Sequence, residues 1–393
     1  MSKDGCRSVN VVLSIADLVP ERGGPSRTVP ALSSALGAEG MSVTLVTLDC
    51  CGESGRKFAP PPPVRTEFVR CTAPGLKQAR WTPQFDARLR ACCLTAGATI
   101  LHDTGLWLPT NHAAASVARK LRLPFIVSPR GMLTQWSMAY RGWKKKLAWR
   151  LYQRRDLESA QILHATSREE LDGFRAVGLR QPVALVPNGV EFPPWKELPP
   201  RETPTRTVLV LCRIHPVKGL LNLVEAWASL RPEGWQVLLA GKDEGGHQRE
   251  VETAIRDHHL EKAFSFCGPV DGDDKWPLYR EADLFALPSH TENFGLVVAE
   301  ALACGLPVIT TQGTPWRELH AQRCGWWVPL GTEPLANALR EATGLTDADR
   351  RAMGRRGRRL IESNYGWPLV AKKMVAVYGW MLGQNAKPDW IIT

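Results

Sequence analysis

Short runs of β-branched residues and leucine recur along this chain, with helical stretches between them. In the first half these runs are 11–14, 43–47, 99–102, 125–128, 162–166 and 183–186. In the second half they are 208–211, 236–239, 264–267, 284–287, 308–310 and 326–328. Strands that alternate with helices form a parallel sheet with crossover helices. The rhythm therefore predicts an α/β protein, and its restart after a break predicts two domains.

The break is the stretch EFPPWKELPPRETPTR at 191–206, where five prolines exclude a helix or a central strand. A chain of 393 residues also exceeds one ordinary core. We therefore expect a first domain at 1–195, a second at 196–366 and a tail at 367–393. Apolar residues in the tail have helical spacing, which predicts a helix packed by one face on the first domain. They are Val370, Met374, Val377 and Met381.

The net charge of +11 favours anionic partners. The sequence has no zinc-finger spacing, arginine-rich tail or aromatic RNA-binding signature, so no nucleic-acid partner is expected. The first apolar run soon meets Asp17 and a Gly-Gly turn, as in a core strand rather than a secretory signal. No stretch approaches the roughly 20 apolar residues that span a bilayer. We therefore expect a cytoplasmic protein. The ten cysteines lack the C-x-x-C spacing of a zinc or redox site, so the sequence predicts no bound metal.

The sequence LPSHTENFGLVVAEALACGLPVIT at 287–310 carries two carboxylates eight residues apart. A strand is expected to end at Pro288, and a helix to run from Gly295 to Ala303. Glu292 then lies in the loop before the helix and Glu300 on the helix, where exposed amides can bind sugar hydroxyls or phosphate.

The glutamate pair suits a sugar, because one carboxylate accepts two hydroxyl hydrogen bonds. The alternative is a helix-start charge at Glu292 and a solvated helix residue at Glu300. The apolar surroundings of Glu300, LVVAEALA, leave little room for an exposed face.

Two further loops carry groups that suit a phosphate. In RIHPVKG, Arg213 and Lys218 follow a strand and can neutralise a diphosphate, although basic loop residues are commonly only solvated. After the first strand, Gly23 and Gly24 permit close backbone approach to an anion, or form an ordinary turn.

These motifs resemble retaining glycosyltransferases of the GT-B fold, in the large family 4 group of bacterial surface-polysaccharide type. The likeness rests on Pro-Ser, Glu-Asn-Phe-Gly, Glu-Ala-Leu-Ala-x-Gly-x-Pro-Val and Gly-Thr-Pro-Trp. It implies two Rossmann-like domains facing each other across a cleft, with a C-terminal helix crossing back to the first. By this resemblance Glu292 holds the transferred sugar, Glu300 binds the donor ribose, and Arg213 and Lys218 bind the diphosphate. The backbone of Asn293, Phe294 and Gly295 also contacts the donor, and Cys212 replaces an expected small residue.

The resemblance also implies roles in the first domain. The loop of Gly23 and Gly24 faces the diphosphate and the acceptor. Related enzymes carry a His-Asp-His-Gly-Leu-Trp sequence whose second histidine lies near the reacting sugar; here Thr104 stands there. This leaves His102, Asp103 and His112 as catalytic candidates. Acceptor-side candidates are Thr104, Trp107 and Arg130.

The segment 139–155 holds seven lysines and arginines and no acidic residue. Trp143, Leu147 and Leu151 recur in it at i, i+4 and i+8. A basic amphipathic helix of this kind suits an anionic membrane, here the inner face of the plasma membrane. A solvated surface helix is the equal alternative.

The sequence thus predicts a metal-independent enzyme that moves a sugar from a nucleotide-diphosphate donor to a glycan or lipid-linked acceptor, without a cofactor. Arg213 and Lys218 stand in for a metal, and the acidic cluster of Asp271, Asp273 and Asp274 is interpreted as a surface loop. A glycoside hydrolase would also use two carboxylates, but that activity does not account for Arg213 and Lys218. A non-catalytic nucleotide-sugar binding protein, an epimerase and a phosphorylase stay open.

Overall fold

The computed structural model describes residues 9–19, 23–49, 58–71, 80–134, 137–138, 142–195, 205–270 and 272–393. The chain divides into two compact units. Unit 1 comprises Met1–Gly189 and Trp367–Thr393, and unit 2 comprises Val190–Gly366. Of the residues named in the predictions above, Asp271 and residues 139–141 and 196–204 lie outside the described residues.

Unit 1 is built on an eight-stranded sheet with the order β14-β7-β6-β5-β4-β1-β2-β3. Its described strands are parallel except for β14, which pairs antiparallel with β7. The strands are β1 (Asn10–Ile15), β2 (Ser42–Asp49), β3 (Arg65–Arg70), β4 (Ile100–Thr104), β5 (Phe125–Ser128), β6 (Ile162–Ala165), β7 (Val183–Leu185) and β14 (Ile391–Ile392).

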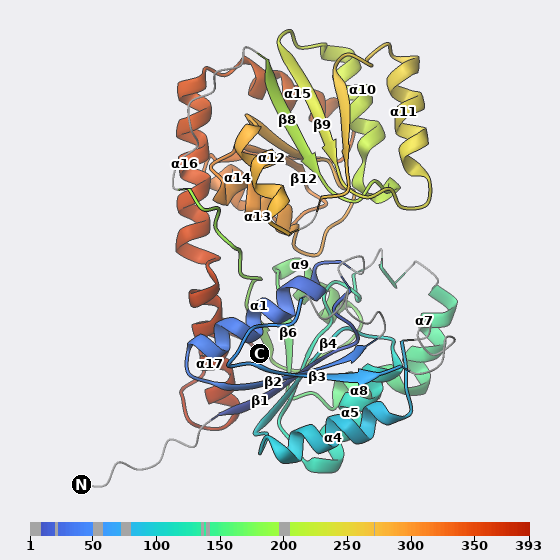
Figure 1. Ribbon diagram of the computed structural model, residues 1–393, viewed down its shortest axis with the longest axis vertical. Coiled ribbons are helices and arrows are strands. Elements are labelled where there is room, and N and C mark those ends of the chain that lie inside the picture. Colours follow the sequence, from blue (N-terminus) through green and yellow to red (C-terminus); the bar gives the residue numbers. More distant parts are fainter. Residues whose placement is uncertain are drawn as a thin grey trace, which may run out of the picture. The chain divides into compact units, whose positions relative to one another are not determined.

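Helices cover both faces of this sheet. Val11, Leu13 and Ile15 of β1 pack against α1 and α17, which lie side by side (Figure 1). Val12 points the other way, because successive strand residues alternate between faces, and joins the core under α4, α5, α8 and α9. The helices are α1 (Pro25–Ala38), α4 (Gln84–Thr95), α5 (Pro109–Leu121), α7 (Gly142–Ala148), α8 (Arg154–Glu158), α9 (Arg168–Ala176) and α17 (Trp367–Met381), with a π-helical turn at Trp149–Gln153.

Unit 2 is a six-stranded parallel sheet with the order β10-β9-β8-β11-β12-β13. Val208 and Val210 of β8 face α10, α11 and α15, whereas Leu209 and Leu211 face the core that contains α13 and α16 (Figure 1). The strands are β8 (Arg206–Leu211), β9 (Trp235–Ala240), β10 (Phe264–Gly268), β11 (Leu284–Leu287), β12 (Val308–Thr311) and β13 (Gly325–Val328). The α-helices are α10 (Leu220–Leu230), α11 (His247–Asp257), α12 (Lys275–Glu281), α13 (Leu296–Ala303), α14 (Glu318–Ala321), α15 (Thr332–Gly344) and α16 (Asp347–Asn364), with 3-10 turns at Pro216–Lys218 and Gly272–Asp274.

The predicted fold class is confirmed, since each unit is a Rossmann-like sheet with helices on both faces. All twelve runs predicted as strands are strands. The tail forms α17 and belongs to unit 1, with Val370, Met374 and Val377 buried. The basic segment differs from the single helix expected, because the π-helical turn interrupts it between α7 and α8.

The contact boundary between the units falls at Gly189 and Val190. Val190 belongs to unit 2 because its amide donates to the Tyr365 carbonyl at 2.8 Å. Gly189 does not adopt a positive φ, so a turn conformation does not account for the glycine. A Cβ here would instead meet the Trp367 ring at 2.2 Å, so close packing requires the glycine.

Candidate functional site

The strand order of unit 2 places two predicted loops next to each other. β8 lies at the centre of the sheet between β9 and β11, and the direction in which the chain adds strands reverses there. Ligands of open α/β sheets bind at such a switch point, outside the carboxyl ends of the strands. The loop after β8 carries Arg213 and Lys218, and the loop after β11 carries Glu292.

Lys218 and Glu292 form an ion pair across this switch point. Their side chains are only 11% and 15% exposed. Ser289 also donates to the same Glu292 oxygen, Oε1, at 2.7 Å. One loop thus supplies a largely buried cation and the other a carboxylate that a hydroxyl already holds in place.

Backbone contacts fix the two loops against each other. The His290 amide donates to the Val217 carbonyl at 2.8 Å and joins the two loops, and the Glu292 amide donates to the carbonyl of Gly313, in the loop after β12, also at 2.8 Å. Gly219 follows Lys218 with φ +66°, and a Cβ there would lie 2.2 Å from the Pro288 carbonyl oxygen. A larger residue at 219 would push the loops apart, so this glycine sets the position of Lys218 relative to Glu292.

Arg213 lies in a different environment from Lys218. It pairs with Glu244, which follows β9, and both side chains are 48% exposed. An exposed pair of this kind contributes little to stability, on the order of 0–1 kcal/mol. An anion at the switch point can therefore recruit Arg213 at small cost.

Glu300 is held by two residues of α12. Lys275 lies 2.7 Å from Glu300 Oε1, and the Tyr279 hydroxyl donates to Oε2 at 3.0 Å. Lys275 is itself buried and lies over the Trp276 ring. The alternative of a solvated helix residue is therefore wrong for Glu300. A carboxylate accepts more than two hydrogen bonds, so these partners leave it able to bind hydroxyls.

The helix between the glutamates begins where the sequence predicted. Gly295 precedes α13 in the left-handed conformation, with φ +75°. Phe294 is a core side chain that contacts the rings of Trp316 and Tyr365, and its carbonyl accepts from the Trp316 indole at 2.6 Å. Asn293 completes the loop between Glu292 and this anchor.

In unit 1 the predicted residue His102 lies in a buried chain of polar groups. His102 Nδ1 lies 2.8 Å from the Tyr378 hydroxyl, and Nε2 lies 2.7 Å from Ser128 Oγ. Beyond Ser128, His164 continues the chain to the Val186 carbonyl, with 2.8 Å at each step. Burial holds the pKa of His102 well below 6.5 and lowers that of His164 to about 3, so both rings are neutral.

The terminal carbonyl fixes the direction of every hydrogen bond in this chain. Val186 can only accept, so His164 donates from Nε2 and its Nδ1 accepts from Ser128. Ser128 then accepts from His102, which accepts from Tyr378. Both His102 nitrogens are occupied and the residue is 0% exposed. The geometry thus gives His102 a structural role that ties α17 to the sheet.

Asp103 is also buried at the switch point of unit 1, where β1 and β4 are neighbours. Ser14 of β1 donates to it at 2.5 Å, and Asn111 of α5 donates at 2.8 Å. Burial raises the pKa of Asp103 to about 7 despite these hydrogen bonds. Both carboxylate oxygens are engaged, so the residue joins β1, β4 and α5.

The other predicted residues of unit 1 surround the ends of the strands. Thr104 is buried at the end of β4, and Trp107 follows it with φ +73° and its amide bonded to Gln153 at 2.7 Å. Arg130 follows β5, buried, and donates to Asn188 at 2.6 Å. His112 lies 2.6 Å from Asp156.

The glycine loop of unit 1 leads into α1. Gly23 has φ +106°, and a Cβ there would meet nothing within 4 Å. Gly24 is the N-cap, and Pro25 opens the helix. Glycine at 23 is therefore required by the backbone conformation and not by close packing.

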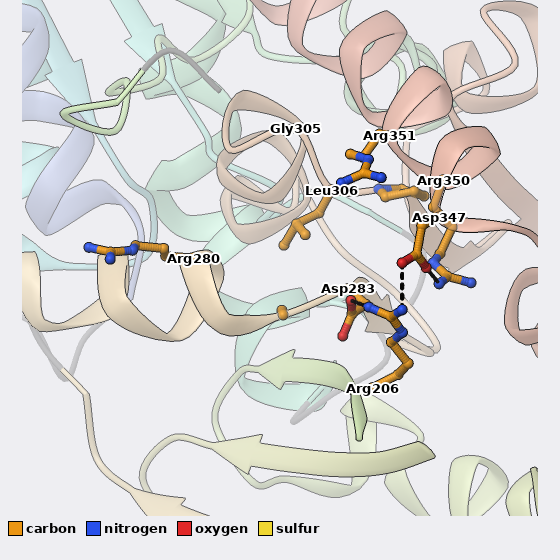
Figure 2. A pocket seen from close by; sticks show the side chains of 10 residues that line it. Arg206, Arg280, Asp283, Gly305, Leu306, Asp347, Arg350 and Arg351 are labelled. Atoms are coloured by element: carbon orange, nitrogen blue, oxygen red, sulfur yellow. Dashed lines mark hydrogen bonds and ion pairs between the residues drawn. The ribbon is translucent and has the colours of Figure 1, made fainter. Parts of the chain in front are cut away.

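A small cavity lies at the opposite edge of the unit 2 sheet, before β8 and β11 (Figure 2). Arg206 reaches Asp283 at 3.3 Å and also pairs with Asp347, which pairs in turn with Arg350. These mutual pairs tie α16 to the sheet, and the cavity is remote from Glu292 along the strands. We assign it a structural role.

Sequence reasoning missed the partners that position the site. Lys275, Tyr279 and Glu244 lie 25, 21 and 31 residues from the groups they hold. A signal existed only for Ser289, in the Pro-Ser motif. Among the described residues, no group of three or more His, Cys, Asp or Glu residues is placed to hold a metal ion. Metal independence stays a prediction.

Comparison with known proteins assigns the family. Residues 193–360 match the model of the glycosyl transferases group 1, and residues 23–189 match that of the glycosyl transferase 4-like domain. The chain belongs to the group 1 glycosyl transferases of the GT-B fold.

Two curated relatives are D-inositol 3-phosphate glycosyltransferases. That of Salinispora tropica is 34% identical over 179 residues, covering 42% of this chain and 36% of the relative. That of Xylanimonas cellulosilytica is 31% identical over 245 residues, covering 56% of this chain and 57% of the relative. The matched part of the chain thus spans between a third and three fifths of these relatives.

Solved structures support the fold. Sucrose-phosphate synthase from Thermosynechococcus elongatus has a TM-score of 0.76 at 22% identity, covering 96% of this chain and 100% of that one. HepE of Anabaena, in complex with UDP and glucose, has a TM-score of 0.71 at 17% identity, covering 95% and 100%. At these identities the likeness concerns the fold alone.

Proposed function

We propose that this protein is a retaining, metal-independent glycosyltransferase that uses a nucleotide-diphosphate sugar. The ion pair of Lys218 and Glu292 at the switch point of unit 2 carries the proposal. It combines a cation suited to a diphosphate with a carboxylate suited to sugar hydroxyls, and Ser289 holds that carboxylate in position. Family membership supports the same activity.

In this proposal the bond between the anomeric carbon and the diphosphate oxygen breaks, and the nucleoside diphosphate leaves with the electron pair. Lys218 and Arg213 stabilise its developing negative charge. Glu292 binds the sugar as it gains positive charge, and Glu300 binds the ribose. The acceptor hydroxyl forms the new bond at the anomeric carbon, and its proton passes to the departing diphosphate oxygen.

The sequence resemblance supports retention of the anomeric configuration. Two cations that can neutralise one diphosphate support metal independence. In unit 1 we propose that Gly23 and Gly24 contact the donor diphosphate, and that Thr104, Trp107 and Arg130 lie on the acceptor side. His102 and Asp103 position these loops and do not touch the substrate, because their polar atoms are engaged inside unit 1.

The proposed acceptor is a lipid-linked or growing surface-polysaccharide glycan, as in lipopolysaccharide assembly, and the proposed location is the cytoplasm. A relative from Komagataeibacter xylinus, named GDP-mannose:cellobiosyl-diphosphopolyprenol alpha-mannosyltransferase, supports a lipid-linked acceptor at 30% identity over 225 residues, 56% of this chain and 56% of the relative.

The test is nucleotide release, measured by mass spectrometry with a panel of nucleotide sugars, with and without a crude lipid-linked acceptor extract. The full chain is compared with Glu292→Ala and with Glu233→Ala, which removes an exposed carboxylate before β9. We expect release from one donor, lost only in Glu292→Ala and unchanged by a chelator.

Other outcomes separate the alternatives. Donor binding without release under any condition identifies a non-catalytic binding protein. An epimerised donor or a released sugar phosphate identifies an epimerase or a phosphorylase. Release that Glu292→Ala leaves intact contradicts the proposed site.

A further inference from the structure

The helical segment 142–158 of unit 1 exposes large apolar side chains along one side. Trp143, Leu147 and Leu151 are 69%, 53% and 71% exposed. Such exposure is unusual for side chains of this size in a row, although single exposed leucines are common. No residue of α7 is buried. This row, Trp143, Leu147 and Leu151, is called the apolar stripe below.

The π-helical turn keeps the stripe in line. In an α-helix, with 3.6 residues per turn, an i+4 step overshoots one full turn. In a π-helix, whose hydrogen bonds run from i to i+5, the turn is wider and the same step falls short. The step from Trp143 to Leu147 is α-helical, and the step to Leu151 enters the π-helical turn Trp149–Gln153. The second step is partly π-helical, so it overshoots a full turn by less than the first step does.

The opposite side of the segment is anchored to unit 1. Tyr152 donates to the Trp107 carbonyl at 3.0 Å, and the buried Gln153 accepts from the Trp107 amide. Asp156 lies within 2.9 Å of Arg119, and Leu157 is 0% exposed. Since this side holds the helix to the unit, the stripe must face away from it. In Figure 1, α7 stands apart from α1 and α17.

The charges beside the stripe are positive. Lys144, Lys146, Arg150 and Arg155 are exposed. The two acidic residues of the segment are already engaged, Asp156 with Arg119 on the anchored side and Glu158 with Arg154 at 2.7 Å. An apolar row with Trp, flanked by Lys and Arg, matches an interface with hydrocarbon below and anionic headgroups above.

We propose that the segment 142–158 docks unit 1 on an anionic lipid surface, with the apolar stripe inserted among the acyl chains and the basic residues at the headgroups. This inference does not rest on the proposed transferase activity. The segment is nevertheless connected to the proposed acceptor side, because it forms hydrogen bonds with both the amide and the carbonyl of Trp107. A lipid-linked acceptor would meet unit 1 from this side. Among the described residues, no helix is long and apolar enough to cross a membrane.

The test is co-sedimentation of the full chain with vesicles of phosphatidylcholine alone, or with about one third phosphatidylglycerol, an anionic lipid content that gives a negative surface. The double variant Leu147→Ser/Leu151→Ser is compared with Leu94→Ser/Leu330→Ser, which removes leucines that are 62% and 49% exposed elsewhere. We expect the wild type and the control to bind anionic vesicles, and the stripe variant to bind at least about ten-fold more weakly.

A second pair of variants isolates the charge. Lys144→Gln/Lys146→Gln/Arg150→Gln is compared with Arg351→Gln/Arg355→Gln/Arg359→Gln, three exposed arginines of α16. Each basic residue near an anionic surface strengthens binding about five-fold, so the first triple variant should lose most of its binding and the second should lose little. Added salt should weaken the wild type.

Three outcomes would overturn the proposal. One is equal sedimentation with neutral and anionic vesicles, and another is equal loss in the stripe variant and its control. The third is a wild type that elutes as a dimer while the stripe variant elutes as a monomer, which would make a second copy of the chain the partner. Donor hydrolysis without acceptor is measured in parallel, so loss of lipid binding with intact hydrolysis separates this inference from the proposed activity.

Discussion

Each unit has a switch point between two central strands, and the side chains at the two switch points differ. In unit 2, Lys218, Glu292 and Arg213 lie in the loops that follow β8 and β11, and all three take part in ion pairs that are partly exposed. In unit 1, Ser14 and Asp103 occupy the corresponding position between β1 and β4, buried and bonded to each other. The same kind of edge thus carries partly exposed charged side chains in one unit and a buried polar pair in the other, so topology alone does not decide which groups are available to a ligand.

The largest expected effect lies in unit 2. Glu292→Gln keeps the size and removes the charge, so it should lower nucleotide release by about 100-fold or more, as loss of one transition-state contact does. Release is measured under saturating donor. Vesicle binding should match the wild type. A folded variant with full nucleotide release would contradict the role proposed for Glu292.

Next is a stability effect in unit 1. His164→Gln disrupts the chain from Tyr378 to Val186 and should lower the local free energy of unfolding by about 2 kcal/mol at pH 7, because buried polar groups lose partners. Amide hydrogen exchange in β4 and β6 measures it. Nucleotide release should change little once the variant is folded.

The same variant has a distinct pH dependence. Burial lowers the pKa of folded His164 to about 3, whereas the unfolded residue titrates near 6.5. As pH falls below 6.5 the unfolded state takes up a proton that the folded state does not, so stability is lost. The variant lacks this histidine. Its free energy of unfolding should therefore fall less steeply with pH than that of the wild type, by about 1.4 kcal/mol per pH unit between roughly pH 6 and 4. Equal slopes would place His164 in contact with solvent.

A smaller effect concerns the partners of Glu300. Tyr279→Phe removes one hydrogen bond to the carboxylate and should weaken donor binding about five-fold, the equivalent of about 1 kcal/mol, with kcat nearly unchanged. Calorimetry gives the affinity, and Tyr152→Phe, a tyrosine of unit 1, serves as the matched control. A change in kcat alone would assign Glu300 to the chemical step.

The smallest effect belongs to the exposed pair. Glu244→Ala releases Arg213 and should change donor affinity by less than about three-fold, because a half-exposed ion pair contributes little. Arg213→Ala should weaken it more. If both variants weaken binding equally, Glu244 itself contacts the donor.

Much of the fold was predictable because local signals carried it. The run 284–287 matched β11 at both ends, and Gly295 marked the start of α13. The pattern does not predict β3, because this edge strand, RTEFVR, is charged and half-buried. It does not predict β14 either, because these two residues form a strand only by pairing with β7. Edge pairing depends on neighbours that the local pattern does not contain.

Site prediction had a similar limit. The sequence shows the spacing of Glu292 and Glu300, but it does not show how far each glutamate is buried or which residues pair with it. His102 looked like Asp103 and Glu292, a polar residue near a strand end, and only the structure shows His102 enclosed by Tyr378 and Ser128. Lys275 gave no signal because its role depends on packing α12 against α13.

The central claim is that the switch point of unit 2 binds the diphosphate of a sugar donor. The most direct measurement is calorimetric titration of the full chain with a panel of nucleoside diphosphates, comparing the wild type, Lys218→Ala and Lys262→Ala, which removes an exposed lysine. We predict that one nucleoside diphosphate binds, at least about ten-fold more weakly to Lys218→Ala and unchanged in Lys262→Ala. Equal binding to all three proteins, or binding to none, would contradict the claim.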